Sequence, residues 1–190
     1  MSKFNENNGV LIQGHIKIHD PESGAVFVNK RNAIHYENMS IALAESVANQ
    51  GQGFINSMAF GNGGTSVDPT GIITYLTPNS TGTNASLYNQ TYSKVVDDRS
   101  VTNLDPQRNK IETRHVNGTN YTDVLVTCLL DYGEPNGQDA VDQASQANSL
   151  YVFDELGLVS FSPSGTGKLL THVVFHPVQK SLNRLVQIDY

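Results

Sequence analysis

The side chains best suited to chemistry are histidines and carboxylates that recur at short spacings. His15 and His19 lie four residues apart, as do His172 and His176, and each pair shares one face of an expected strand. A zinc ion needs three or four ligands that converge on it. Residues four apart in a strand are separated by roughly 13 Å, so neither pair can bind one ion alone. The carboxylates that could assist them are Asp20, Asp154 and Glu155. We expect solvated or interface histidines and no metal site.

Other catalytic or ion-binding motifs are incomplete. Asp97, Asp98 and Asp105 could offer oxygen ligands to calcium, but the spacing of a calcium-binding loop is missing. The sequence has no G-x-S-x-G motif, and without tryptophan it supplies poorly the sugar platform that glycoside hydrolases use. We therefore expect no catalytic residue, no cofactor and no metal ion, and a protein that is not an enzyme.

Two glycine-rich segments look at first like phosphate-binding loops. Residues 164–168 read SGTGK, but Ser162 stands where a P-loop needs its first glycine, and an apolar strand follows where a helix should begin. Residues 61–64 read GNGG and lack the G-x-G-x-x-G spacing. We predict a hairpin turn at 164–168. For 61–64 we predict a backbone role, because glycine permits positive φ or a close approach between chain segments.

Composition excludes several classes of protein. The net charge is −6, and charged residues make up only 16% of the 190 residues. A nucleic-acid-binding face needs clustered positive charge, which the sequence lacks. No apolar run is long enough to cross a membrane, and the N-terminus lacks the apolar core of a signal peptide. The only cysteine, Cys128, lies in an apolar run and is expected to be buried and inert.

The pattern along the chain is mainly that of β-strands. We predict strands at residues 10–19, 25–30, 54–60, 110–116, 121–132, 150–160, 169–176 and 184–190. Turn signals at 20–24 and at Asn117-Gly118 predict hairpins, and the strand at 121–132 is expected to be central in its sheet. Pro177 is expected at a strand end or a sheet edge. A short helical turn is conceivable at 138–146, within the loop 134–147.

One short helix is expected at about residues 39–50. Asn38 or Ser40 can cap its N-terminus, and Gly51 stands where a glycine often ends a helix. An apolar stripe would then face the sheet, and it comprises Met39, Leu43 and Val47.

Residues 72–108 are mostly polar, with short apolar patches and little pattern. A long unpatterned segment in a compact domain usually has a binding or assembly role. We interpret this segment as an arm that packs on a neighbouring subunit.

The predicted fold is a mainly β, sandwich-like single domain over 1–190, with one short helix and a long extended loop or arm. We divide it into an N-terminal hairpin at 1–37, a helix, strand and glycine loop at 38–71, the arm at 72–108 and a sheet core at 109–190. In the strand at 150–160, Glu155 is expected to anchor hydrogen bonds or a salt bridge, since an acid among apolar residues needs a partner. Gly157 is expected at a bulge or a close approach.

The order of these motifs resembles the N-terminal attachment domain of tail-collar fibre proteins of tailed bacteriophages. The resemblance covers roughly residues 40–190. Its motifs are the helix at 43–49, M-A-F-G-N-G at 58–63, Asp68-Pro69, L-Y-N at 87–89, F-D-E-L-G-L-V at 153–159, the turn at 165–167 and the strand at 184–190. This chain adds a hairpin at 10–31, and it stops after the closing strand, where fibre proteins continue into a shaft and tip.

The resemblance implies a non-catalytic, oligomeric structural protein located in the virion and assembled in the host cytoplasm. It would act as an adaptor at the neck, collar, tail or baseplate. Its partners would be copies of itself and other virion proteins, contacted through residues 1–10 and 72–108, without nucleic acid or membrane. Two alternatives remain: a capsid decoration protein, and a small adhesin that binds a host glycan through loop 61–71 or 134–147.

Overall fold

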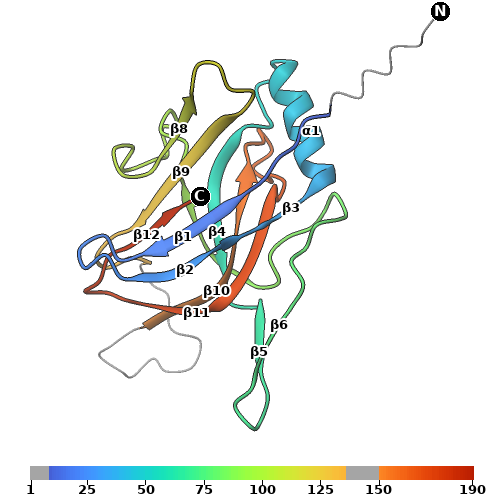
Figure 1. The fold of residues 1–190 in the computed structure, drawn as a ribbon. Helices are drawn as coiled ribbons and strands as arrows, with labels where there is room; N and C mark the ends of the chain where they lie inside the picture. The colour runs from blue at the N-terminus through green and yellow to red at the C-terminus, as the bar shows by residue number, and fades with distance from the viewer. Residues whose placement is uncertain (1–8, 136–149) are drawn as a thin grey trace, which may run out of the picture.

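The computed structural model describes residues 9–135 and 150–190, and it confirms a mainly β, sandwich-like fold with one short helix (Figure 1). Two five-stranded antiparallel sheets pack face to face, and a two-stranded hairpin projects from them. The elements are β1 (His15–His19), β2 (Val26–Arg31), β3 (Ala33–Ile34), α1 (Tyr36–Val47), β4 (Ile55–Gly61), β5 (Thr65–Val67), β6 (Ile73–Tyr75), β7 (Gln90–Val95), β8 (Lys110–His115), β9 (Thr122–Leu130), β10 (Leu150–Ser160), β11 (Thr171–Ser181) and β12 (Val186–Asp189).

The first sheet has the strand order β2-β1-β12-β9-β8. Its opening hairpin confirms the turn predicted at 20–24, where the Asp20 carboxylate accepts hydrogen bonds from the backbone N–H groups of Glu22 and Ser23. The Asn117-Gly118 turn joins β8 to β9, with Gly118 at φ +88°. Because β9 pairs with β8 on one side and β12 on the other, the prediction that this strand is central is also confirmed.

The second sheet has the order β3-β11-β10-β4-β7. Strand β10 has the bounds predicted for it, and Gly157 within it lies so close to β11 that a Cβ atom would sit 2.2 Å from the Thr171 carbonyl oxygen. Pro177 lies where β11 is an edge, since β3 pairs only with its first two residues. The SGTGK segment turns β10 back toward β11, with the Gly165 N–H donating to the Ser162 carbonyl.

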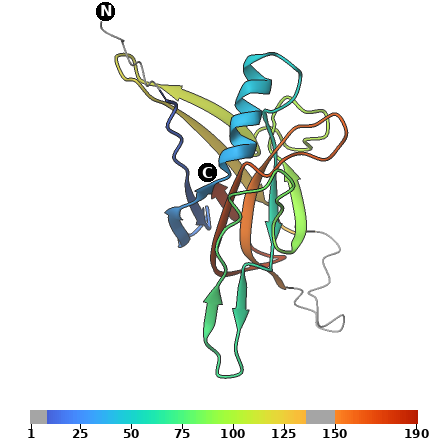
Figure 2. The ribbon, with the colours of Figure 1, turned by 90° about the vertical axis from the view of Figure 1, so that its right-hand side faces the viewer.

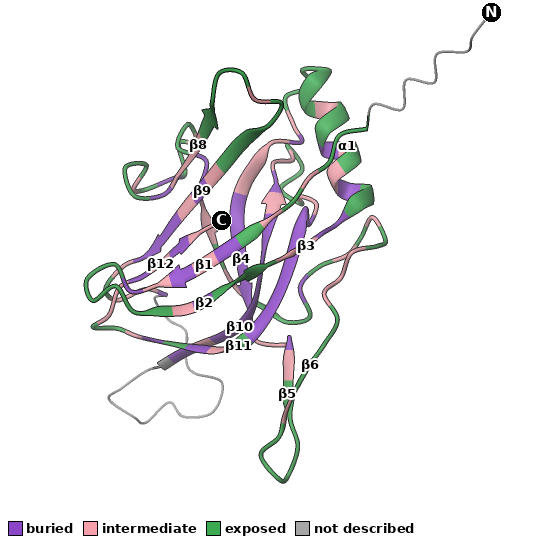
Figure 3. Ribbon diagram, viewed as in Figure 1, coloured by how far each residue is buried: buried purple, intermediate pink, exposed green. Residues whose placement is uncertain are grey.

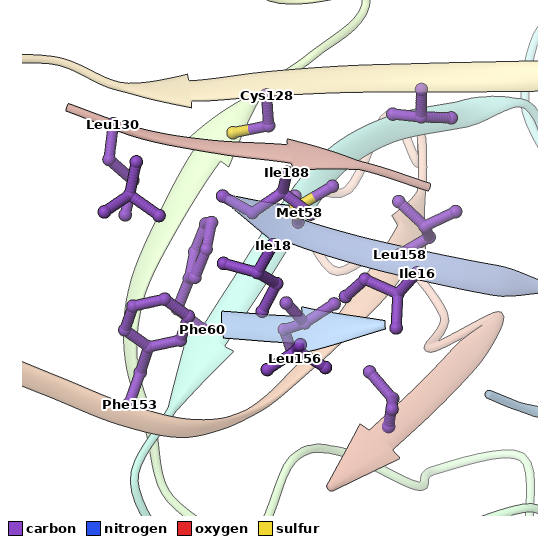
Figure 4. Packing of buried hydrophobic residues seen from close by; sticks show 14 of the residues in the cluster. Ile16, Ile18, Met58, Phe60, Cys128, Leu130, Phe153, Leu156, Leu158 and Ile188 are labelled. Atoms are coloured by element: carbon purple, nitrogen blue, oxygen red, sulfur yellow. The ribbon is translucent and has the colours of Figure 1, made fainter. Parts of the chain in front are cut away.

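The core fills the space between the sheets (Figures 3 and 4). Alternate residues of each strand point inward, including Ile16 and Ile18 of β1 and Met58 and Phe60 of β4, all fully buried. Burial of each such side chain stabilises the fold by about 1.5–3 kcal/mol. Cys128 is fully buried among them, as predicted, and this burial raises the pKa of its thiol to about 12.

Helix α1 differs from its prediction in register and in its buried face. It begins at Tyr36, and the His35 side chain, rather than Asn38 or Ser40, caps it by accepting a hydrogen bond from the Asn38 N–H. The buried residues are Asn38 and Ala42, while Leu43 is 41% exposed and Val47 is 86% exposed.

The predicted apolar stripe is therefore wrong, although Met39 does pack partly against the core. Polar contacts explain the orientation, because the buried Asn38 amide donates to the Leu169 carbonyl. The chain leaves the helix through Asn49, at φ 52°, before reaching Gly51.

The segment 72–108, predicted to be an arm, contributes one strand to the chain's own sandwich, so that prediction is wrong for β7 and the buried residues beside it. Strand β7 lies in the second sheet, paired with β4, and Val96 and Leu87 are buried. The beginning of the segment, with β6, stands away from the sandwich (Figures 1 and 2). The sequence pattern is weak because β7 is an edge strand whose residues are half-buried or exposed.

Two predicted features lie outside the described residues. They are the helical turn at 138–146 and most of the N-terminal segment 1–10, of which only residues 9 and 10 are described. Val10 is 83% exposed.

Candidate interaction site

The β5–β6 hairpin projects from the sandwich and is ordered by its own turn (Figure 2). Thr65 pairs with Tyr75, and Val67 pairs with Ile73. At the turn, the Asp68 carboxylate accepts hydrogen bonds from the Thr70 hydroxyl and from the N–H groups of Thr70 and Ile72. These bonds lower the pKa of Asp68, so the turn is held by a charged carboxylate at neutral pH.

The hairpin exposes apolar side chains. Val67 and Ile72 are each 63% exposed, and Tyr75 and Leu76 are also exposed. An isolated two-stranded hairpin is only marginally stable in water, and clustered exposed apolar side chains mark contact surfaces. The arrangement therefore suits a contact with another molecule.

Two adjacent carboxylates of β10 fix the base of this hairpin. Asp154 accepts hydrogen bonds from the Gly64 N–H at 2.8 Å and the Thr65 N–H at 2.9 Å. Neighbouring residues of a strand normally point to opposite faces. Here the register of β10 against β11 shifts between Phe153 and Glu155, and this bulge lets both carboxylates serve the same loop.

Glu155 is fully buried and has four hydrogen-bond donors. The His172 Nε2 lies 2.9 Å from its Oε2, and the backbone N–H groups of Gly63, Tyr88 and Asn89 donate to the carboxylate at 2.8–3.1 Å. Burial alone raises the pKa of a carboxyl group, but here the hydrogen bonds outweigh burial and lower the Glu155 pKa below its ordinary value. Glu155 is thus an ionised anchor, as predicted.

His172 connects this anchor to the segment that crosses the outer face of the second sheet. The Asn79 N–H donates to His172 Nδ1 at 2.8 Å, and the Tyr88 ring lies 5.6 Å from the imidazole between ring centroids. Below this segment, Leu87 packs on Ala59 and Leu169. The anchor therefore holds both the base of the hairpin and the chain that follows it.

The GNGG segment has the backbone role predicted for it. A Cβ atom on Gly61 would lie 2.5 Å from Glu155 Oε1 and 2.5 Å from the Asn89 carbonyl oxygen. Glycine is needed here because a side chain would not fit. Its backbone angle is not the reason, since the φ of Gly61 is not positive. Every donor that contacts Glu155 is a backbone or imidazole N–H, so the carboxylate is held from several directions.

His172 contacts Glu155, whereas the other histidines and the aspartates considered as calcium ligands lie at separate places in the structure. His19 contacts Asp189 at 2.9 Å, and His176 contacts the Tyr75 hydroxyl at 3.2 Å. Asp97 pairs with Arg99, and Asp105 pairs with Arg108. Across residues 9–135 and 150–190, no three His, Cys, Asp or Glu side chains are grouped so that they could hold a metal ion.

No known protein family, curated protein or solved structure matches this chain. The site therefore rests on its geometry. Sequence reasoning named Asp154, Glu155 and His172 as candidate ligands and expected Glu155 to be an anchor, but it did not predict the contact between His172 and Glu155. The acidic pair Asp154-Glu155 inside an apolar strand is the sequence signal for this site. His172 stands out in the sequence as a polar residue in the apolar run 169–175, but nothing there places it beside Glu155.

Proposed function

We propose that this chain is a non-catalytic structural protein of a tailed-bacteriophage virion. It acts as an oligomeric adaptor or attachment module of the neck, collar, tail or baseplate, and the β5–β6 hairpin makes the contact with a neighbouring chain. The observation that carries the proposal is this hairpin, which presents exposed apolar side chains on a base held by two buried carboxylates.

The phage assignment is supported by how the motifs of the resemblance meet in space. The segment 58–63 is β4 with its following turn, and the segment 153–159 is the adjacent part of β10. The Tyr88 and Asn89 amides of the L-Y-N element donate to Glu155. Three motifs that are far apart in sequence thus form one structural unit, as expected if they belong to a common fold.

We propose the hairpin, rather than the whole of 72–108, as the contact surface, because β7 is part of the chain's own second sheet. In the described part of the chain, no helix has the length and hydrophobicity needed to cross a bilayer. We propose that the partner is a protein, either a second copy or another virion protein.

Light scattering after size-exclusion chromatography tests the role of the hairpin. The wild type is expected to be oligomeric, and a Val67→Asp/Ile72→Asp variant should be monomeric, because two charges would be desolvated in the contact. The matched control is Val101→Asp/Leu104→Asp, which alters two residues that are 98% and 96% exposed in another loop. A wild type that is monomeric and binds no other virion protein would refute the assembly role.

Mass spectrometry of purified phage particles that carry the gene tests the virion assignment separately. The chain should be present in stoichiometric amounts in the particles. Its absence from intact particles would contradict the assignment even if the protein oligomerises through the hairpin.

A further inference from the structure

Two hollows on the described surface differ in whether their polar side chains already have partners within the chain. The larger, of about 720 Å³, lies on the outer face of the first sheet. Its charged side chains already have ion-pair partners: Glu112 contacts Lys110 at 3.4 Å and Arg114 at 3.3 Å, Asp189 contacts His19, and Arg108 contacts Asp105. Such a face is already satisfied and gives no specific ligand an advantage.

The second hollow has a volume of about 630 Å³ and lies between the end of α1, the start of β4 and the segment after β7. We call it the Phe54 groove. Its volume falls in the range of small-molecule sites. The residues that matter for the argument are Asn49, Phe54, Asn56, Asp97, Arg99 and Phe161.

Two aromatic rings form the apolar part of the Phe54 groove. Phe54 and Phe161 stack with centroids 4.9 Å apart and planes within 8°, and both are half-buried. The Phe161 N–H donates to the Phe54 carbonyl at 2.7 Å, so the backbone fixes the pair. A held pair of half-buried rings offers an apolar platform at little cost in side-chain entropy.

Amide side chains supply the polar part. In the ranges that the structure describes, the Asn49 and Asn56 amides make no hydrogen bond. The Asn56 carbonyl accepts hydrogen bonds from the Val96 and Asp97 N–H groups, so the backbone is fixed while the side chain remains available. Each amide can both donate and accept.

The Phe54 groove carries little net charge. Asp97 is 5% exposed and contacts Arg99, whose guanidinium carbon lies 5.8 Å from the Phe54 ring centroid. The charges of Asp97 and Arg99 cancel, so the groove offers no net positive charge to attract phosphate or acidic ligands.

From this combination we propose that the Phe54 groove binds a neutral oligosaccharide. A sugar ring has an apolar face that packs on an aromatic ring, and its hydroxyls both donate and accept, which matches the unpaired amides. The site lies away from the loop 61–71, whose base is closed by Glu155 and Asp154.

Binding is tested on the full chain with a panel of neutral hexose and N-acetylhexosamine oligosaccharides, and with sialylated and sulfated oligosaccharides as acidic probes. Calorimetry should detect saturable binding of at least one neutral probe, and amide NMR shifts should centre on the side chains of Asn49 and Asn56. Asn56→Ala should weaken binding about tenfold, the loss expected for hydrogen bonds to one amide. The matched control, Gln107→Ala, changes an amide in the other hollow and should leave binding unchanged.

A Phe161→Leu variant separates loss of the platform from loss of folding, because it keeps an apolar side chain. It should also weaken binding while retaining the wild-type circular dichroism spectrum. The proposal is overturned if no neutral probe binds at about 10 mM, if only acidic probes bind, or if Asn56→Ala and Phe161→Leu leave binding intact. None of these outcomes bears on oligomerisation through the hairpin.

Discussion

His172 Nε2 lies 2.9 Å from Glu155 Oε2, and both side chains are fully buried beneath the segment that follows the hairpin. The Asn79 N–H donates to His172 Nδ1, so this nitrogen acts as an acceptor and the imidazole proton lies on Nε2, facing the carboxylate. The tautomer of His172 thus follows from a backbone hydrogen bond. The segment that contains Asn79 and the buried Glu155 stabilise each other through this imidazole.

Glu155→Gln should lower the free energy of unfolding by about 3 kcal/mol or more, because a buried charge with several partners is lost. The amide NH₂ would also face backbone N–H groups that now donate to the carboxylate. Urea unfolding followed by circular dichroism measures the change. Glu112→Gln, at a partly exposed ion pair, is the control and should cost under about 1 kcal/mol. Equal effects of the two variants would contradict the anchor role.

The contribution of Glu155 should depend on pH. Its pKa in the folded state lies below the ordinary value of 4.5, so the unfolded chain takes up the proton first as pH falls. The stabilisation is therefore fully present above about pH 5 and is lost as pH falls through the folded pKa. The stability difference between wild type and Glu155→Gln should shrink in this acid range. Subtracting the unfolding free energy of Glu155→Gln from that of the wild type removes the contributions of the other carboxylates. If this difference stays constant down to pH 2, the linkage is ruled out.

Asp154→Asn should loosen the hairpin base with a smaller effect on the whole fold. The amide can replace only part of the pair of hydrogen bonds that Asp154 accepts from the Gly64 and Thr65 N–H groups. Hydrogen exchange at these two amides should accelerate about tenfold, while the free energy of unfolding falls by about 1–2 kcal/mol. Asp98→Asn, at an exposed position, serves as the control. Unchanged exchange at Gly64 and Thr65 would show that Asp154 does not hold the hairpin.

Sequence reasoning succeeded where one strand carried its own pattern. Alternation placed Ile16 and Ile18 in the core, and an acid in an otherwise apolar strand marked Glu155 as an anchor. It failed where long-range pairing decides the structure. Strand β7 is a polar edge strand whose place is set by β4, and the partners of Glu155 are brought together only by the sheet and the crossing segment.

Cys128 should be unreactive in the native protein. Burial raises the pKa of its thiol to about 12, so thiolate is scarce at pH 8, and the side chain is fully enclosed. Labelling with Ellman's reagent should proceed only as fast as the protein opens, and in guanidinium chloride it should be complete within the mixing time. Rapid stoichiometric labelling of a folded sample would show that this part of the core is accessible.

The last prediction concerns which face of α1 is packed. Ala42 is 2% exposed and faces the core, whereas Ala44 is exposed on the same helix. Ala42→Val should cost about 1–3 kcal/mol by overpacking, since Ala42 belongs to the buried core cluster. Ala44→Val should lower the free energy of unfolding by less than about 0.7 kcal/mol, which is the difference in helix propensity between alanine and valine. If the stripe predicted from sequence faced the sheet instead, Leu43→Ser would cost more than about 2 kcal/mol, while Ala42→Val would be tolerated. Urea unfolding of the three variants therefore distinguishes the observed helix orientation from the one that the apolar spacing favours.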